Sequence, residues 1–421
     1  MSSNPSQKRL SVLVSAYACG PGRGSEPGVG WNVARELSRY HHVHVFTRSN
    51  NRAAIEQELS DRPNPNLHFT YFDPPGWAAW LPPAQLPHYY SWQIAAYFMA
   101  RKLLAVQTFD IVHHVTYVRY SSPSFLSLLS IPFVWGPVGG GEQAPKAFSR
   151  SFGLRGKGYE FLRNLSHGAG EVDPFTRITA QRSVVARATT ADTAHRLERI
   201  GAKYVEVSSA IGLPEEEIER LSEYTYPQPS PIRFITIARL LHWKGIHLGI
   251  QAFAQVAEKY PCEYRILGKG PERKALDALV DKLGMADRIE FLGERSRDET
   301  LQQLSDCHAL LHPSLHDSGG FVCLEAMAAG RPVVCLDLGG SAVQVSPETG
   351  ILVPAKEPKQ AVDDLAQAME QLITDSELRQ RLGQAGKTRV QTHFSWKAKG
   401  AELSGKYYQY IDIHNLNRAN R

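Results

Sequence analysis

The amino-acid sequence predicts an α/β protein made of two Rossmann-like domains, each a parallel sheet covered by helices. Two observations carry this prediction. Short apolar segments typical of buried strands alternate with longer segments of helical spacing in both halves of the chain. A length of 421 residues, with 43% apolar and 21% charged residues, suits two folded domains better than one core or a disordered chain.

The first half carries the first alternation. Residues 10–15 predict a buried strand, residues 28–40 a helix, and residues 43–47 a second strand, which together make one β-α-β unit. Further strands are expected at 67–72, 111–114 and 133–135. Strands that alternate with helices in this way favour a parallel sheet with both faces covered.

The second half repeats the pattern after a proline-rich stretch at 227–231, which is typical of a linker between domains. Its expected strands are 232–237, 263–267, 288–292, 309–312 and 332–336, with helices at 249–258 and 272–283. Residues 395–413 predict a closing helix. We therefore expect an N-terminal domain at 1–212, a C-terminal domain at 213–394 and a last segment at 395–421.

Charge and cysteine content narrow the classes of partner. Lys and Arg total 47 against 42 Asp and Glu, a surplus too small to favour nucleic-acid binding. The five cysteines include no C-x-x-C pair, so neither a disulfide framework nor a zinc site is expected. Residues 1–10 lack a signal-peptide core and no run of about 18 apolar residues occurs, so we expect a cytoplasmic protein.

The richest motif in the sequence is residues 312–332. A strand is expected to end at His312, a glycine-containing loop follows, and a helix should open near Gly320 and close at Gly330. Its N-terminus would offer free N–H groups to an anion such as a diphosphate. Asp317 would lie in the loop before this helix, and Glu325 about one to two turns inside it. Two carboxylates placed in this way suit hydroxyl-rich ligands, because each can accept hydrogen bonds from neighbouring hydroxyls. The alternatives are that Asp317 caps the helix and Glu325 pairs with a surface cation.

A second cluster, residues 237–245, brings two cations to the same edge of the expected sheet. Arg239 and Lys244 follow a strand and precede a helix, so both emerge where α/β folds bind ligands. Fixed cations there can hold a diphosphate and stabilise the charge it gains when a sugar leaves. As isolated residues they would be solvated surface charges. The Gly268-Lys-Gly270 segment that ends another strand is a weak signal and is often only a turn.

These residues resemble the retaining enzymes of glycosyltransferase family 4, which have the GT-B fold: two Rossmann-like domains facing each other across a cleft, with a last helix that returns to the first domain. The family pattern of Arg, four residues and Lys-Gly is met at Arg239 and Lys244, and its pair of acids is met at Asp317 and Glu325. The segments at 267–271, 291–293, 326–333 and 349–354 follow the family's usual course. Where the family usually has Glu, Asp317 is shorter by one methylene.

The resemblance implies a hexosyltransferase that uses a nucleotide diphosphate sugar, with no cofactor and no metal. Arg239 and Lys244 would hold the diphosphate, Glu325 the ribose and Asp317 a hydroxyl of the donor sugar. Further donor contacts would come from Ser318, Gly319, Gly320, Phe321, Gly268 and Gly293. The absence of any D-x-D triplet or His/Cys cluster agrees with metal-independent catalysis.

In the first half, a glycine-rich loop at 19–31 joins the first strand to the first helix, and the resemblance places Gly28 and Gly30 near the donor. The alternative is a flexible turn. Residues 109–117 contain His113 and His114, either of which could substitute for the family's catalytic histidine, whose register falls on Val115. The competing interpretation is a packed, hydrogen-bonded core histidine.

A basic and aromatic segment at 146–163 completes the candidates. Five cations stand there against the single acid Glu160, with four aromatic residues between them. This composition suits the anionic inner face of a membrane or a lipid-linked acceptor, and a packed loop is the alternative. The function expected from the sequence is sugar transfer to a carbohydrate or lipid-linked acceptor. The rivals are a nucleotide-sugar epimerase or hydrolase of the same fold and a non-catalytic nucleotide-sugar binding protein.

Overall fold

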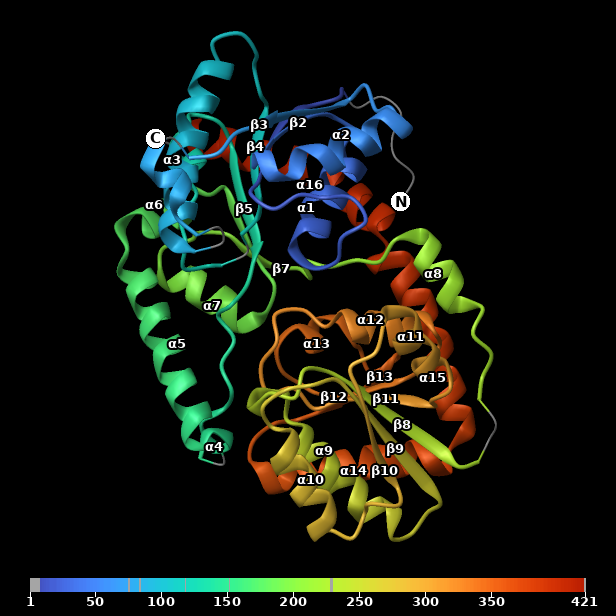
Figure 1. Cartoon of the computed structure of the whole chain (residues 1–421). Helices are drawn as coiled ribbons and strands as arrows, with labels where there is room; N and C mark the ends of the chain where they lie inside the picture. Colours follow the sequence, from blue (N-terminus) through green and yellow to red (C-terminus); the bar gives the residue numbers. More distant parts are fainter. Residues whose placement is uncertain are drawn as a thin grey trace. The chain divides into compact units, whose positions relative to one another are not determined.

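The computed structural model describes residues 8–74, 76–82, 85–117, 119–150, 152–227 and 230–419. Its contacts divide the chain into two units. The first unit is Met1–Gly141, Asn164–Ile211 and Trp396–Arg421, and the second is Glu142–Arg163 and Gly212–Ser395. Each unit contains one parallel sheet (Figure 1).

The sheet of the first unit has the order β3-β2-β1-β4-β5-β6-β7. Its strands are β1 Ser11–Ala16, β2 His42–Thr47, β3 Leu67–Tyr71, β4 Ile111–Thr116, β5 Phe133–Val138, β6 Val185–Ala188 and β7 Val205–Val207. Every residue of β4, β5 and β6 is buried, as expected for parallel strands covered on both faces. The two short strands β6 and β7 were not predicted from the sequence.

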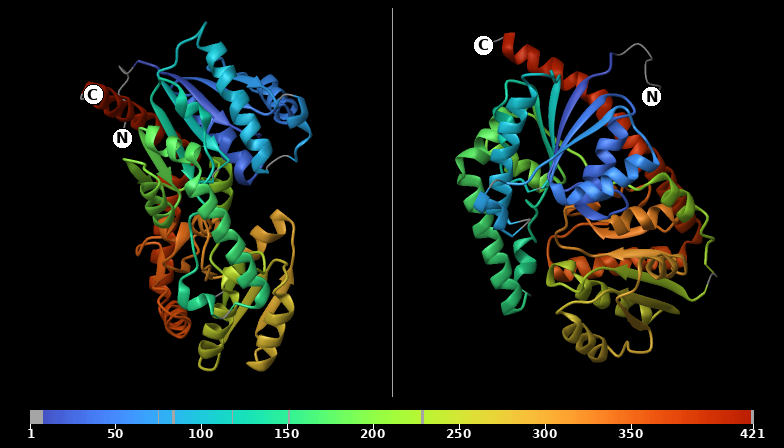
Figure 2. Two further views of the ribbon diagram at one scale, coloured as in Figure 1. Left: turned by 90° about the vertical axis from the view of Figure 1, so that its left-hand side faces the viewer. Right: turned by 45° about the horizontal axis from the view of Figure 1, so that its top comes forward.

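The helices of the first unit cover both faces of this sheet. They are α1 Ser25–Leu37, α2 Arg52–Asp61, α3 Leu86–Leu103, α6 Pro174–Arg182, α7 Ala191–Arg199 and α16 Trp396–Ala419, with short 3-10 turns η1 Ser49–Asn51, η2 Gly76–Trp80 and η3 Phe125–Leu128. The last helix, α16 (red in Figure 2), packs against α1, where Gly400 lies so close to Glu36 that a Cβ would come within 2.5 Å of its side chain. The predicted return of the last helix to the first domain is confirmed.

The second sheet has the order β10-β9-β8-β11-β12-β13. Its strands are β8 Ile232–Ile237, β9 Cys262–Leu267, β10 Ile289–Gly293, β11 Ala309–His312, β12 Val333–Leu336 and β13 Gly350–Val353. The helices are α8 Glu215–Ser222, α9 Ile246–Ala257, α10 Arg273–Lys282, α11 Arg297–Ser305, α12 Phe321–Ala328, α13 Gly339–Gln344, α14 Pro358–Thr374 and α15 Ser376–Arg389, with η4 His242–Lys244 and a π-helical turn, η5 Val390–Phe394. Both predicted Rossmann-like sheets are confirmed.

Two features of the domain organisation differ from those expected. The proline-rich stretch at 227–231, of which residues 228 and 229 lie outside the described part, falls within the second unit and is not the linker between domains. The second unit resumes at Gly212, one residue before the expected boundary at 213, and helix α8 follows from Glu215. The apolar side chains Ile218 and Leu221 of α8 are buried, which keeps this helix with the second unit.

The second difference is Glu142–Arg163, which we call the strap. Our predicted N-terminal domain at 1–212 includes it, but its contacts are with the second unit. It contains α4 Lys146–Ser149 and the first part of α5 Leu154–Val172 (Figure 1). Phe148 and Phe152 are buried in the hydrophobic core of the second unit, so these two aromatic rings cannot face a membrane.

Candidate donor site

The turn after β8 is pressed against the loop after β11. Gly245 has φ +62, and a Cβ there would lie 1.9 Å from the carbonyl oxygen of Pro313, so no other residue fits this approach. The N–H of Leu315 donates to the carbonyl of Trp243 at 2.8 Å. Two loops that are far apart in the sequence are therefore held together at the carboxyl edge of the second sheet, where ligands bind in such folds.

Each of these loops contributes one charged side chain to an ion pair. Lys244 Nζ lies 2.5 Å from Asp317 Oδ2, and both side chains are mostly buried. The backbone of Asp317 is held as well, because its carbonyl accepts the N–H of Gly340 at 2.7 Å. The alternative in which Asp317 caps the helix is not realised, since the N-cap of α12 is Gly320. The predicted opening of this helix near Gly320 is confirmed.

His312, the last residue of β11, points a ring nitrogen at this pair. Its Nε2 lies 3.8 Å from Asp317 Oδ2 and has no hydrogen-bond partner among the described residues, although the side chain is 3% exposed. Burial, reinforced by the charge of Lys244, lowers the pKa of His312 to about 4, so the imidazole is neutral near pH 7. A buried polar atom without a partner is costly, which makes this nitrogen a candidate contact for a bound ligand.

The second acid, Glu325, lies inside α12 and is 4% exposed. Its Oε1 accepts a hydrogen bond from Arg297 Nη2 at 2.8 Å, and the same guanidinium nitrogen pairs with Glu217. Burial raises the pKa of Glu325, and the neighbouring Arg297 opposes that rise. Glu325 therefore pairs with a half-exposed cation, Arg297, as the alternative interpretation of the sequence predicted.

Arg297 is a site residue that our sequence analysis missed. Its surroundings form a capping box in which Ser296 and Glu299 satisfy each other's backbone N–H groups at the start of α11. That pattern can be read from the sequence and places Arg297 in the first helical turn. It does not reveal that the side chain reaches Glu325, because the contact joins two helices.

The remaining candidates of the second unit divide into exposed and buried positions. Arg239 follows β8 and is exposed, while Ser318 and Gly319 are partly buried beside Asp317. Gly268 has φ +130, and a Cβ there would lie 1.9 Å from the carbonyl oxygen of Ala238. This glycine therefore lets the β9 loop pack against the loop that carries Arg239. Gly293 also has positive φ, +69, in an open turn.

In the first unit, the glycine-rich loop folds over its own helix. Helix α1 begins at Ser25, three residues before the predicted start. A Cβ on Gly28 would lie 2.1 Å from the carbonyl oxygen of Arg23, and one on Gly30 would lie 2.3 Å from that of Ala18. Close backbone packing inside the loop explains both glycines without a ligand.

The two histidines of β4 are fully buried. His113 has both ring nitrogens occupied, Nδ1 by the Tyr407 hydroxyl at 2.7 Å and Nε2 by the Gly136 carbonyl at 2.5 Å. Burial lowers the pKa of His113 to about 3 and that of His114 to about 4. For His113 these contacts favour the packed core histidine over a catalytic role.

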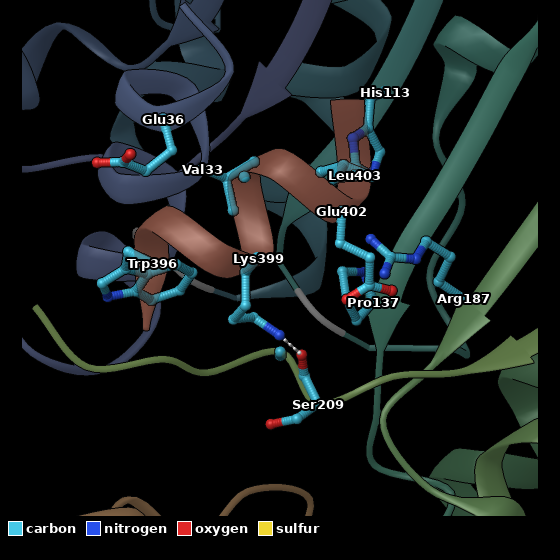
Figure 3. Close-up of a pocket in the computed structure, with 12 residues that line it drawn as sticks. Val33, Glu36, His113, Pro137, Arg187, Ser209, Trp396, Lys399, Glu402 and Leu403 are labelled. Carbon is cyan, nitrogen blue, oxygen red and sulfur yellow. Dashed lines mark hydrogen bonds between the residues drawn. The ribbon is translucent and has the colours of Figure 1, made fainter. Parts of the chain in front are cut away.

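A small cavity lies beside His113 in the first unit (Figure 3). Its volume is about 20 Å³, enough for one water molecule and too small for a sugar. Lys399 Nζ donates to the Ser209 carbonyl at 2.6 Å in its wall, and burial of the ammonium group lowers the pKa of Lys399 to about 7. The cavity lies where α16 meets the first unit and is no candidate for substrate binding.

Within the described ranges, the fold gathers no set of three or more His, Cys, Asp or Glu side chains able to ligate a metal ion. No helix that the structure describes combines the length and apolar character needed to cross a bilayer.

Two parallel Rossmann-like sheets and a last helix that rejoins the first unit define the GT-B fold. Solved structures agree. The lipopolysaccharide outer core galactosyltransferase WaaB matches with a TM-score of 0.63 at 14% identity, covering 97% of this chain and 100% of that one. Anabaena Alr3699/HepE in complex with UDP-glucose matches with a TM-score of 0.56 at 16% identity, covering 94% and 100%.

Sequence comparison relates the candidate site to a known family. Residues 220–389 match the family described as glycosyl transferases group 1. The chain is 32% identical over 179 residues to a D-inositol 3-phosphate glycosyltransferase of Corynebacterium diphtheriae, a match that covers 41% of each protein. The chain thus spans less than half the length of the curated relatives it matches. Residues 220–389 are therefore similar to the glycosyl transferases group 1 family, in agreement with the resemblance stated from the sequence.

Proposed function

We propose that the protein is a retaining glycosyltransferase that moves a hexose-type sugar from a nucleotide diphosphate sugar to an acceptor. The observation that carries this proposal is the group Lys244, Asp317 and His312. It combines a fixed cation, a carboxylate and a buried imidazole nitrogen that has no hydrogen-bond partner among the described residues, close to the opening of helix α12. The family match of residues 220–389 supports the proposal independently.

The ion pair between Lys244 and Asp317 suggests how the donor would bind. Asp317 neutralises Lys244 in the ion pair. A diphosphate that reaches Lys244 and Arg239 would compete for the ammonium group and release the carboxylate to accept a bond from a sugar hydroxyl. The N–H groups of residues 318–321 would add neutral donors to the phosphates. As the bond from the anomeric carbon to the diphosphate breaks, its electron pair passes to the phosphate oxygen, whose new charge these groups stabilise.

Glu325 has a different task in this account. One carboxylate oxygen is held by Arg297, which orients the group and opposes its protonation. The other oxygen would accept hydrogen bonds from the ribose hydroxyls of the donor. Arg297 is then a positioning residue for the ribose contact.

We propose a chemical class for the donor and another for the acceptor. A uridine diphosphate hexose is the first donor to try, since UDP-glucose is bound by a solved structure of this fold. The acceptor would be a carbohydrate or a lipid-linked intermediate, used at the inner face of a cytoplasmic membrane. We further propose that no metal is needed, because two cations and a helix N-terminus offset the diphosphate charge.

Turnover assays with donor panels test the proposal against its rivals. The purified protein should release nucleoside diphosphate from one nucleotide sugar only when a suitable acceptor is added, and should do so in the presence of a chelator. Free sugar or an epimer formed from donor alone would favour the hydrolase or epimerase. Binding of a nucleotide sugar without any turnover would favour the non-catalytic binding protein.

A further inference from the structure

Beside the donor site, one carboxylate of the strap contacts both loops that carry its charged residues. Glu160 Oε1 lies 3.1 Å from His242 Nε2 and 3.0 Å from His316 Nε2. His242 stands two positions before Lys244, and His316 directly precedes Asp317. A single oxygen atom therefore joins the turn after β8 to the loop after β11.

The direction of these hydrogen bonds follows from the state of Glu160. Burial acts to raise the pKa of this carboxyl, but the hydrogen bonds from His316 and His242 and the charge of Arg163 lower it below its usual value. An ionised carboxylate only accepts, so each imidazole donates its Nε2–H. Arg163 lies 3.7 Å from the other carboxylate oxygen, Oε2, which leaves Oε1 to the two rings.

Aromatic packing reinforces the same junction. The Tyr159 ring stacks on Trp243 with centroids 4.9 Å apart, and Trp243 stacks on His316 at 5.3 Å. Phe152 meets the His242 ring edge-on at 4.8 Å. A Cβ on Gly156 would lie only 3.0 Å from the His242 ring, so the helix can approach closely because this residue is glycine. The strap is thus packed onto both loops and not merely bonded at one point.

We infer that Glu160 is a positioning residue of the donor site: through His242 and His316 it fixes the two loops so that Lys244 and Asp317 meet the donor diphosphate and sugar. This inference rests on the proposed function. Lys244 has a flexible four-carbon stem, so the placement of its ammonium group depends on how firmly the turn beneath it is held. Loss of the clamp leaves each charge present but less well placed, which is costly for an electrostatic site.

Three variants of Glu160 separate positioning from charge. Glu160→Ala removes the clamp and should lower kcat by at least about tenfold. Glu160→Gln keeps an oxygen that can accept both imidazole N–H groups and should restore kcat to within about threefold of wild type. Glu160→Asp keeps the charge but cannot span both rings, and should resemble the Ala variant. The control is Glu258→Ala, an exposed carboxylate of the same unit, which should match wild type.

A double-mutant cycle decides whether Glu160 acts through Lys244. In the Lys244→Ala background, the effect of Glu160→Ala on kcat should fall below about threefold, because one of the two groups that it positions is gone and only the contribution through Asp317 is left. An undiminished tenfold effect there, wild-type kcat in Glu160→Ala, or a failure of Gln to rescue would each overturn the inference. Wild-type protein that neither binds nucleoside diphosphates nor turns over any nucleotide sugar would instead refute the proposed function. Melting curves of each variant exclude simple unfolding, and Glu160→Asp replaces Glu160→Ala if the latter does not fold.

Discussion

The strands β4 and β11 hold the same place in their sheets, each next to the first strand of its unit, and both carry histidine near the carboxyl end. His113 on β4 is bonded at both ring nitrogens by groups of its own unit. His312 on β11 is equally buried, yet its Nε2 has no partner among the described residues and faces Asp317. His113 has both ring nitrogens engaged in packing, whereas one ring nitrogen of His312 is available to a ligand. The hydrogen bonds that each ring already makes, and not the residue type, therefore separate these two histidines.

Among the substitutions that test this comparison, loss of a cation of the second unit should have the largest effect on turnover. Lys244→Ala should lower turnover roughly 100-fold or more, and Arg239→Ala should have a similar effect, because each substitution removes a preorganised cation that would stabilise the leaving diphosphate. Both variants should stay folded. Steady-state kinetics with the best donor provide the measurement, and exchange of the exposed Lys274 for Ala serves as a control in the same unit. Near-normal turnover in both variants would remove the leaving-group site.

The two histidines should respond in opposite ways. His113→Ala leaves the Tyr407 hydroxyl and the Gly136 carbonyl without partners and should cost roughly 2 kcal/mol of unfolding free energy, with turnover of the folded protein within about threefold of wild type. His312→Ala should cost little stability but lower turnover roughly tenfold. Denaturant unfolding and kinetics on both variants test this. If the effects are reversed, β4 and not β11 carries the site.

A smaller effect belongs to the cavity at α16. The folded pKa of Lys399, about 7, lies below its ordinary value of 10.5, so between these limits the unfolded chain binds more protons than the folded one. Wild type should therefore gain about 1 to 2 kcal/mol of stability relative to Lys399→Met as pH rises from about 7 to about 8.5. Unfolding curves across this range measure it, with the exposed Lys397→Met as control. Parallel pH profiles for wild type and Lys399→Met would show that Lys399 stays charged in the fold.

The smallest expected effect concerns the membrane. Although Phe148 and Phe152 of the strap are buried, Leu154, Phe161 and Leu162 are exposed, and Arg155 and Lys157 lie exposed on the same helix. We expect binding to anionic vesicles that salt weakens, with about a fivefold loss for Lys157→Ser, since one cation near such a surface contributes about 1 kcal/mol. Sedimentation with neutral and anionic vesicles measures it, and Lys274→Ser is the control. Binding that ignores vesicle charge would leave a soluble acceptor as the better proposal.

Much of the fold could be predicted because buried parallel strands are short apolar runs that alternate with segments of helical spacing. β8 and β11 were predicted to the residue, and the helix opening at Gly320 followed from its glycines. The strands β6 and β7 were missed because a charged residue, Arg187 in β6 and Glu206 in β7, interrupts each short apolar run. Arg239, Lys244, Asp317 and Glu325 could be proposed as site residues from the sequence because they lie in local motifs.

The missed residues are those whose role depends on a partner distant in sequence. Glu160 lies 156 positions from His316, and Arg297 lies 28 positions from Glu325, so no window of sequence contains either contact. The sequence left the strap open between two interpretations for the same reason. Its basic and aromatic composition suits a membrane-binding segment and a packed segment equally well, and the burial of Phe148 and Phe152 shows that these two rings are packed.

The central claim, that the second unit holds the donor with ribose at Glu325 and sugar at Asp317, is tested most directly by nucleoside diphosphate affinity. Calorimetric titration should show binding to wild type, a loss of about 1.5 to 3 kcal/mol in Glu325→Ala, and near wild-type affinity in Asp317→Ala, because free nucleoside diphosphate has the ribose but no sugar. Equal losses in the two variants, or unchanged affinity in Glu325→Ala, would contradict this assignment.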